Sequence, residues 1–374
     1  MKSTLLKMSH ICKSYPGVKA INDVSIDLFA GEVLGIMGEN GAGKSTLIKL
    51  LAGAEKKDSG EIYIDEKKVD INSPKASQEN GVSVIYQELI TMDTLSVAEN
   101  IFVGQLPVNK VTKLIDWKAA QKKSTEVLAL LNSNIKPKSI VATLSVYEKQ
   151  IVEVAKAIHK NAKVVVMDEP TAALSEKDSK SLFKVIENLK NQGVGIIYIS
   201  HRIEEVFKIS DRITVMRDGK LIATKQTKDA EKKEIISMMI GRELNQFFPE
   251  IKSEKKGVMM KVSDLNINGI IENISFEVKK GEILGIFGLV GSGCLNIARA
   301  LIGVDDIDQG EIHINGKKTS IKNPKIALKN NIGFIPIDRK NEGLTLNFSV
   351  KQNLTLQSID ELGSSFIIQE SIEN

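Results

Sequence analysis

Nine residues, 38 to 46, have the types and spacing of a loop that binds the phosphates of a nucleotide. They read Gly-Glu-Asn-Gly-Ala-Gly-Lys-Ser-Thr and fit the pattern G-x-x-x-x-G-K-[ST]. An apolar run, 33–37, precedes the loop and a helical pattern follows it, which is the setting that this motif requires. The alternative is a glycine-rich turn that only caps an ordinary helix, and the flanking strand pattern argues against it.

Each residue type in this loop has a chemical purpose. Glycines allow backbone N–H groups to point at phosphate oxygens, and the helix N-terminus adds partial positive charge. Lys44 is expected to reach the β- and γ-phosphates, and the Ser45 hydroxyl is expected to ligate Mg²⁺. The predicted nucleotide-binding residues of the loop are Gly38, Glu39, Asn40, Gly41, Ala42, Gly43, Lys44, Ser45 and Thr46.

A second copy of the loop occurs 250 positions later, with Lys44 replaced by Cys294 and Ser45 by Leu295. The segment Gly-Glu-Val-Leu-Gly-Ile at 31–36 returns as Gly-Glu-Ile-Leu-Gly-Ile at 281–286. The glycines recur without insertion, at 38, 41, 43, 53 and 60 and again at 288, 291, 293, 303 and 310. A repeat of this period indicates tandem domains. The second domain is predicted to have the fold of the first without its phosphate chemistry.

Bulk composition excludes several classes of protein. The chain has 374 residues, 42% hydrophobic and 26% charged, which is ordinary for a globular protein with room for two domains. A net charge of +4 without a long basic block gives nucleic-acid binding no support. Two cysteines favour a reducing compartment, and neither a spanning stretch nor a signal peptide is recognisable. The expected location is cytoplasmic, and contact with a membrane would need a partner.

Strand and helix patterns alternate, which predicts an α/β fold with a parallel sheet and antiparallel additions. Hairpins are expected at 61–69, 216–221 and around Asn315-Gly316, and buried strands at 164–167 and 196–199. Helical patterns cover 116–131 and 151–158. The predicted domains are residues 1–243 and 258–374, joined by a charged, irregular linker at 244–257.

Further motifs follow the loop in order. Tyr86-Gln87-Glu88 ends one apolar run, and Val-Val-Val-Met-Asp-Glu-Pro-Thr at 164–171 is a strand that ends in two acids. Ser200-His201-Arg202 ends the next strand. This set resembles the ATP-binding subunits of ABC transporters. The doubled arrangement with a degraded second loop resembles the fused subunits of bacterial monosaccharide importers of the ribose, galactose and xylose type, and the resemblance covers essentially the whole chain.

The resemblance implies a role for each residue. Asp168 would orient Mg²⁺ together with Ser45 and Gln87, and Glu169 would polarise the attacking water. His201 would contact the γ-phosphate, Gln87 would also couple to the membrane partner, and Tyr15 would stack on adenine. Each residue alone has an ordinary structural explanation, such as a turn cap for the acids or a half-buried surface aromatic for Tyr15.

One segment departs from the family pattern. The serine of the family's signature is matched by Ser145, but its glycine position holds Tyr147, whose ring should obstruct close approach to a phosphate. Ser145 and Glu148 also fit a helix capping box, and both interpretations stay open. By the repeat, the second domain's own signature, acidic strand and switch histidine would lie beyond Asn374. A truncated product, a fragment and assembly with another cassette would all explain this, and we expect weak hydrolysis by the chain alone.

The predicted function is that of an ATP- and Mg²⁺-dependent ATPase subunit that energises monosaccharide import. Its expected partners are permease subunits at the inner face of the cell membrane, a solute-binding protein indirectly, and possibly a second cassette chain, without nucleic acid. The alternatives are a silent or weak paralogue that binds only ATP, a cassette for nucleosides or another solute, and a soluble tandem ATPase acting on ribosomes. The short linker and the eroded second loop argue against the last.

Overall fold

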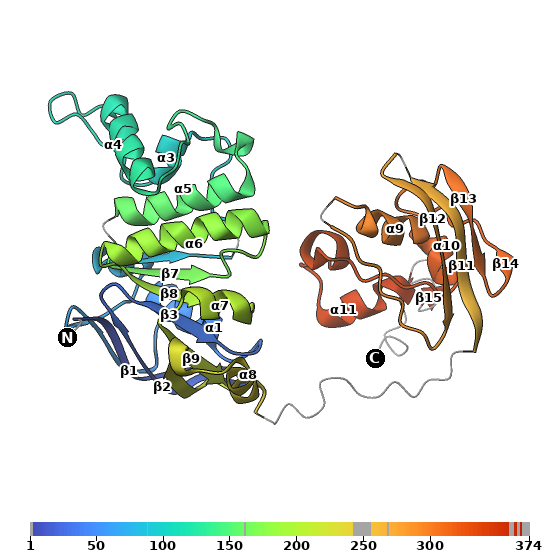
Figure 1. Cartoon of the computed structure of the whole chain (residues 1–374), viewed down its shortest axis with the longest axis horizontal. Helices are drawn as coiled ribbons and strands as arrows, with labels where there is room; N and C mark the ends of the chain where they lie inside the picture. The colour runs from blue at the N-terminus through green and yellow to red at the C-terminus, as the bar shows by residue number, and fades with distance from the viewer. Residues whose placement is uncertain are drawn as a thin grey trace. The chain divides into compact units, whose positions relative to one another are not determined.

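The computed structural model describes residues 3–87, 89–160, 162–241, 256–267, 269–289, 291–358, 363–364 and 367–368. The chain divides into two compact units, Met1–Phe247 and Phe248–Asn374 (Figure 1). The predicted linker at 244–257 lies outside the described residues except for Lys256 and Gly257. No helix in the described part of the chain is both long and apolar enough to cross a membrane.

A six-stranded sheet forms the centre of the first unit. Its strands run parallel except for β10, which pairs antiparallel with β9 at one edge. In order across the sheet they are β10 (Lys220–Gln226), β9 (Arg212–Arg217), β3 (Val33–Met37), β8 (Gly195–Ile199), β7 (Val164–Asp168) and β6 (Val82–Ile85).

The parallel strands are buried on both faces, because helices cover one side and a second sheet covers the other. In β7, Val165 and Met167 join one core cluster while Val164 and Val166 join the other. The same alternation with a period of two occurs in β3 and β8. This explains why the sequence shows continuous apolar runs here and no alternation with polar residues.

Helices pack against one face of the sheet and extend into a helical subdomain beyond it (Figure 1). α5 begins at Val146, five residues before the expected start at 151, because Ser145 and Glu148 form a capping box. The hairpins and strands expected at 61–69, 164–167, 196–199 and 216–221 are confirmed. The helices of this face and of the subdomain, all of which contribute to one core cluster, are α3 (Val97–Ile101), α4 (Trp117–Leu130), α5 (Val146–His159), α6 (Glu176–Asn191), α7 (Ile203–Ile209) and α8 (Lys232–Ile240).

An antiparallel sheet covers the opposite face, with α1 (Lys44–Leu51) packed between the two sheets. Leu47, Ile48 and Leu51 of α1 are almost fully buried there. Short helix α2 (Pro74–Glu79) precedes β6. In order across the antiparallel sheet the strands are β2 (Val18–Phe29), β1 (Thr4–Tyr15), β4 (Ser59–Ile64) and β5 (Lys67–Val69).

The second unit repeats the antiparallel sheet of the first, as the duplicated sequence predicts. α9 (Cys294–Leu301) occupies the position of α1, 250 residues later. The Asn315-Gly316 turn joins β13 to β14 with both residues in the left-handed region, as a two-residue hairpin requires. Its elements are β11 (Lys256–Ile267), β12 (Ile271–Lys280), β13 (Gln309–Ile314), β14 (Lys317–Lys318), α10 (Pro324–Lys329), α11 (Val350–Thr355), β15 (Gly363–Ser364) and β16 (Ile367–Ile368).

The two units differ in the segments that correspond to β3 and β6. Residues 283–287 and 332–335 form no strand, and among the described residues of the second unit none pairs with them. Ile283, Phe287 and Ile335 are consequently 85%, 95% and 94% exposed, whereas Val33, Met37 and Ile85 are almost completely buried. The described part of the second unit therefore presents a large apolar surface where the first unit has a core.

A buried ion pair links the two sheets of the first unit. The Arg212 guanidinium at the start of β9 contacts Asp27 Oδ1 at 2.8 Å and Glu32 Oε1 at 3.3 Å. The Glu32 side chain is only 3% exposed, and its other oxygen accepts a hydrogen bond from Phe29 N. Burial raises the pKa of Glu32, while Arg212 and the Phe29 hydrogen bond oppose that rise. Arg212 is thus the partner that makes a buried carboxylate tolerable at this junction.

We expect Arg212→Leu to lower the free energy of unfolding by about 3–5 kcal/mol, because it leaves the Glu32 carboxylate buried without its partner. The double variant Glu32→Gln/Arg212→Leu should recover a large part of that loss, since no charge then remains buried. Urea denaturation of the whole chain, followed by circular dichroism, measures both. Equal destabilisation by the single and double variants would show that Arg212 stabilises by packing alone.

Candidate functional site

The phosphate loop joins the end of β3 to the start of α1, at the carboxyl edge of the parallel sheet. Gly43 has φ +100° and Gly41 has φ +86°, conformations that residues with a side chain rarely adopt. A Cβ at Gly43 would also lie 2.6 Å from Ala20 O. The α1 N-terminus has no side-chain cap, so its first N–H groups are available to a ligand.

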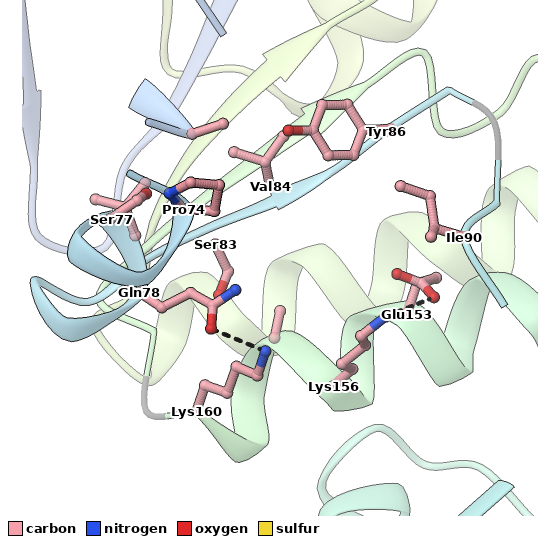
Figure 2. Close-up of a pocket in the computed structure, with 13 residues that line it drawn as sticks. Pro74, Ser77, Gln78, Ser83, Val84, Tyr86, Ile90, Glu153, Lys156 and Lys160 are labelled. Carbon is pink, nitrogen blue, oxygen red and sulfur yellow. Dashed lines mark hydrogen bonds and ion pairs between the residues drawn. The ribbon is translucent and has the colours of Figure 1, made fainter. Parts of the chain in front are cut away.

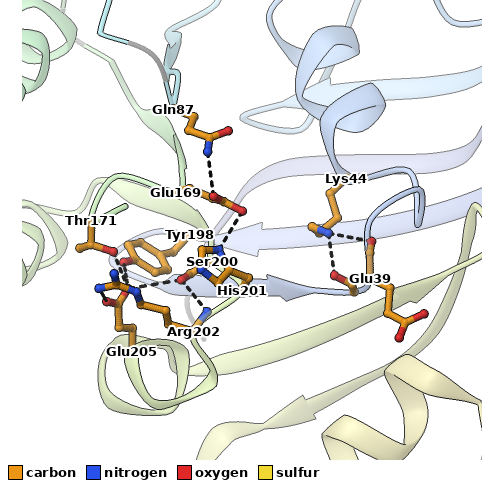
Figure 3. Close-up of polar contacts among 11 residues, drawn as sticks. Glu39, Lys44, Gln87, Glu169, Thr171, Tyr198, Ser200, His201, Arg202 and Glu205 are labelled. Carbon is orange, nitrogen blue, oxygen red and sulfur yellow. Dashed lines mark hydrogen bonds and ion pairs between the residues drawn. The ribbon is translucent and has the colours of Figure 1, made fainter. Parts of the chain in front are cut away.

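Lys44 lies inside this loop. Its Nζ donates to Gly38 O at 2.6 Å and to Glu39 O at 3.0 Å (Figure 3). Burial lowers the pKa of Lys44, while the nearby carboxylates of Glu169 and Asp168 act to raise it. The ammonium group is thus held by loop carbonyls, and Lys44 lines the same pocket as the two acids.

The ends of the neighbouring strands bring the other predicted polar residues together. Because Ile36, Ile199 and Asp168 are in register across β3, β8 and β7, their carboxyl ends meet at one edge. The Glu169 carboxylate accepts from Gln87 Nε2 at 3.0 Å and contacts His201 Nδ1 at 3.1 Å (Figure 3). Three residues predicted separately from sequence therefore form one contact group.

Glu169 has an unusual backbone for a residue of its type. Its φ is +47°, in the left-handed region, while its N–H donates to Ile199 O at 2.8 Å. Such strain clusters at functional sites, where the surrounding structure enforces it. Here it turns the chain sharply after β7 and directs the carboxylate toward Gln87 and His201.

A pocket of about 560 Å³ collects most of these residues. Of the predicted residues, Gly38, Glu39, Ala42 and His201 do not line it: Ala42 is buried in the core, and His201 is an exposed side chain that contacts Glu169 of the lining. The predicted residues that do line the pocket are Tyr15, Asn40, Gly41, Gly43, Lys44, Ser45, Thr46, Gln87, Asp168 and Glu169.

Sequence reasoning missed five lining residues, at the start of β2 and in the β9–β10 turn. They are Val18, Lys19, Ala20, Asp218 and Gly219. The turn is fixed by hydrogen bonds from Asn22 N to Gly219 O and from Gly219 N to Ala42 O. The Asp218-Gly219 pair gave a clear hairpin signal, but nothing local indicates that this hairpin packs against the phosphate loop.

Glu205 on α7 was also missed. It accepts hydrogen bonds from Thr171 and Tyr198 at 2.6 and 2.9 Å and contacts Arg202 at 3.1 Å (Figure 3). Burial raises the pKa of Tyr198, so its hydroxyl remains a donor. Glu205 thereby ties the chain after Glu169 to the chain around His201, and acts as a support for both rather than as a contact of the pocket.

Oxygen donors in the pocket match the preference of Mg²⁺. The Ser45 hydroxyl, the Asp168 carboxylate and the Gln87 amide all line it, and hard oxygen ligands are those that Mg²⁺ favours. Burial, with a further contribution from Glu169, raises the pKa of Asp168 from 3.8 to about 6, against the opposing effect of Lys44. The ionised carboxylate of Asp168 is therefore destabilised near neutral pH, and a cation bound in the pocket would stabilise it.

The segment at 145–148 forms the capping box expected as one of its two interpretations. Ser145 Oγ accepts from Glu148 N, and Glu148 Oε2 accepts from Ser145 N at 2.8 Å. The Tyr147 ring is half-buried against the core, with its hydroxyl bonded to Ser181 of α6. Part of its bulk is thus accommodated inside the unit.

The second loop keeps the shape of the first without its chemistry. Gly291 and Gly293 have φ of +87° and +83°, close to those of Gly41 and Gly43. At the lysine position, Cys294 Sγ lies 3.3 Å from Ser292 Oγ. Ile337 occupies the position of Gln87 and is 84% exposed.

Comparison with known proteins places the chain in a family. Residues 21–172 and 271–373 match the family model described as ABC transporter. The chain belongs to the ABC transporter family. It is an ATP-binding cassette protein with α/β cassette architecture, of the class of ATPases coupled to transport, and the two matched segments correspond to the two copies of the repeat.

Two relatives and one solved structure illustrate the similarity. Ribose import ATP-binding protein RbsA of Clostridium perfringens (strain SM101 / Type A) is 42% identical over 365 residues, covering 98% of this chain and 73% of that protein. A putative ribose/galactose/methyl galactoside import ATP-binding protein of Halalkalibacterium halodurans is 44% identical over 357 residues, covering 96% and 68%. The crystal structure of an ATP-binding cassette of an ABC transporter in its ADP conformation has a TM-score of 0.55 at 27% identity, covering 63% of this chain and 95% of that one.

The raised pKa of Asp168 predicts that its ionised carboxylate lowers the stability of the nucleotide-free chain. A carboxyl whose folded pKa exceeds its unfolded value contributes most to stability below the unfolded pKa and loses that contribution as pH rises through the folded pKa. Asp168→Asn should therefore raise the free energy of unfolding of the nucleotide-free chain above about pH 6. A shift of this size corresponds to about 3 kcal/mol at most, and we expect about 1–2 kcal/mol because the pocket is open to water.

Urea denaturation across this pH range measures the effect, with the exposed carboxyl variant Asp229→Asn as the control. The gain should shrink as pH falls from about 6 toward 3.8. A gain that is the same at every pH, or that the control shares, would contradict burial as its cause.

Proposed function

We propose that this chain binds ATP with Mg²⁺ in the Lys44 pocket and uses its hydrolysis to energise the import of a monosaccharide through a membrane permease. One observation carries the proposal: Lys44, Asp168, Glu169 and Gln87 converge on one pocket at the carboxyl edge of the sheet. The names of the relatives, which are import ATP-binding proteins for ribose or for ribose and galactosides, support the solute class.

The geometry suits binding and orientation of a triphosphate. Backbone N–H groups of the loop and of the first turn of α1 would donate hydrogen bonds to the phosphate oxygens. Lys44 would neutralise part of the negative charge of the β- and γ-phosphates. Tyr15 lines the same pocket, where its ring offers a face for the base. Ser45, Asp168 and Gln87 would hold Mg²⁺, which would neutralise the negative charge that develops on the phosphates.

Hydrolysis then requires a base that can orient a water molecule. Glu169 is placed for this role because its carboxylate faces the pocket and its two oxygens are already engaged by Gln87 and His201. His201 can donate to the carboxylate or turn toward the γ-phosphate, and Gln87 links the site to the chain that leads into the helical subdomain.

The proposed contact with the permease lies next to Gln87. A hollow of about 190 Å³ lies beside β6 and α5, lined by Tyr86, Ile90, Glu153 and Lys160 among others (Figure 2). Lys160 Nζ donates to Gln78 Oε1 at 3.0 Å along its wall. Tyr86 is the direct neighbour of Gln87, which lines the Lys44 pocket. Binding of nucleotide in that pocket would therefore affect a short permease helix bound in this hollow. The location proposed for the assembly is the inner face of the cell membrane, on the cytoplasmic side.

Glu169→Gln should bind ATP with an affinity within about threefold of the original chain while lowering the hydrolysis rate by about 10²–10⁴-fold, the range for loss of a general base. Lys44→Ala should instead weaken binding itself, since it removes the ammonium group from the loop. A fluorescent ATP analogue and a phosphate-release assay measure the two properties. The exposed variant Glu176→Gln on α6 is the control for a glutamate removed elsewhere.

The assay is run on the chain alone and on the chain co-purified with candidate sugar or nucleoside permeases. We expect slow turnover alone and faster turnover, dependent on Glu169, with a sugar permease. Turnover that Glu169→Gln leaves unchanged would refute the assignment of the base. Stimulation only by a nucleoside permease would replace the sugar with a nucleoside, and an absence of turnover in every complex would identify a silent ATP-binding paralogue.

A further inference from the structure

An exposed hairpin projects from the helical subdomain of the first unit, between α3 and α4. Residues 107–116 form it: Val108 and Ile115 pair antiparallel, and Asn109 N donates to Leu114 O at 2.8 Å. Figure 1 shows this stretch as a loop that extends beside α4, away from the sheet. We call it the 107–116 hairpin.

The hairpin is a built structure with a fixed tip. Asn109 Oδ1 accepts from Val111 N at 2.9 Å and Thr112 N at 3.1 Å, which closes the turn. At its base, Leu106 packs against the core and Asp116 caps α4 by accepting from Ala119 N. The side chains at its tip are therefore presented by a defined backbone.

The tip exposes large apolar side chains that the fold does not bury. Val111 is 89% exposed and Leu114 is 69% exposed, and Val108 on the flanking strand is 56% exposed. Trp117, at the start of α4, is 44% exposed and is the one tryptophan of the chain. Exposed apolar groups gathered at one place usually mark a contact surface.

Positive charge surrounds these apolar groups. Residues 105–123 hold five lysines against one acid, Asp116, whose carboxylate is engaged as the α4 cap. The five are exposed, and the ion pairs of the described residues involve other lysines. They are Lys110, Lys113, Lys118, Lys122 and Lys123.

We propose that the 107–116 hairpin and the first turn of α4 bind an anionic lipid bilayer directly, with Val111 and Leu114 entering the headgroup region. A bilayer interface suits all three kinds of side chain at once: the apolar tip meets the acyl boundary, lysines reach lipid phosphates, and Trp117 lies at headgroup level. A second protein suits it less, since a stable protein interface takes about 20–30 residues a side and this is one short hairpin.

This contact goes beyond the proposed import function and does not depend on it. It would give the cassette a second hold on the membrane, alongside any permease. One apolar tip with a few lysines is a weak, reversible anchor, so the contact would orient the helical subdomain rather than fix the chain to the surface.

Because Trp117 is the sole tryptophan, its fluorescence reports on this element directly. The full chain is titrated with vesicles of phosphatidylcholine alone and of equimolar phosphatidylcholine and phosphatidylglycerol. We expect a blue shift of Trp117 emission and co-flotation of the chain with the anionic vesicles only, both reduced by added salt. No shift with anionic vesicles would overturn the proposal.

Variants separate insertion from general electrostatic attraction. Val111→Ser/Leu114→Ser should lower the partition coefficient about tenfold or more, and Lys110→Gln/Lys118→Gln about tenfold. The matched controls are Leu130→Ser, an exposed apolar residue elsewhere on α4, and Lys177→Gln/Lys184→Gln on α6. ATP binding, measured in parallel, should be unchanged in all four, which shows that each is folded.

Equal losses in the controls and the hairpin variants would overturn the proposal, as would a blue shift that appears only when a permease is present in the vesicle. The latter result would assign the hairpin to a protein partner. A shift that follows protein concentration without vesicles would assign it to contact between copies of this chain.

Discussion

The site depends on the parallel pairing of β3, β8, β7 and β6. Hydrogen bonding in register makes the carboxyl ends of these strands coincide, so residues far apart in the sequence leave the sheet at one edge. Lys44, Gln87, Glu169 and His201 each follow one of these strands, and the contacts of Glu169 with Gln87 at 3.0 Å and with His201 at 3.1 Å are a consequence of that alignment. Burial on both faces holds the strands in place. Hydrogen bonds of Glu205 and of the β9–β10 turn then fix the segments that follow these strands.

The second unit contains a loop of the same shape, but its described residues include no parallel sheet next to that loop. Its glycines have nearly the same backbone conformation as those of the first loop, and α9 takes the place of α1. In its described residues, however, the counterparts of β3 and β6 have no neighbouring strands, and the lysine is replaced by Cys294. Loop shape is therefore set locally by glycine, whereas the reactive group requires side chains delivered by separate strands.

Sequence was sufficient where the chemistry is local. The glycine-rich loop between a strand and a helix, the hairpins with Asn-Gly or Asp-Gly turns and the doubly buried strands each have a pattern within a few residues, and the structure confirms these local conformations. The sequence did not allow contacts between residues far apart in the chain to be predicted. The helical pattern alone predicts a start for α5 at 151, five residues too late, because the capping box at Ser145 also matches a binding segment. Neither Ala20 nor Gly219 carries any local sign that it lines the pocket. Glu205, three residues after Arg202, could have been suspected only from its spacing on a short helix.

Of the two similarly shaped loops, we expect the first to bind nucleotide, because it has a cation, Lys44, in one pocket with the acids of a neighbouring strand. Equilibrium dialysis of labelled ATP with Mg²⁺ against the chain tests it by stoichiometry. We expect one ATP bound per chain, lost in Lys44→Ala and retained in Cys294→Ala. Binding of two molecules, or binding that survives Lys44→Ala and disappears in Cys294→Ala, would contradict it.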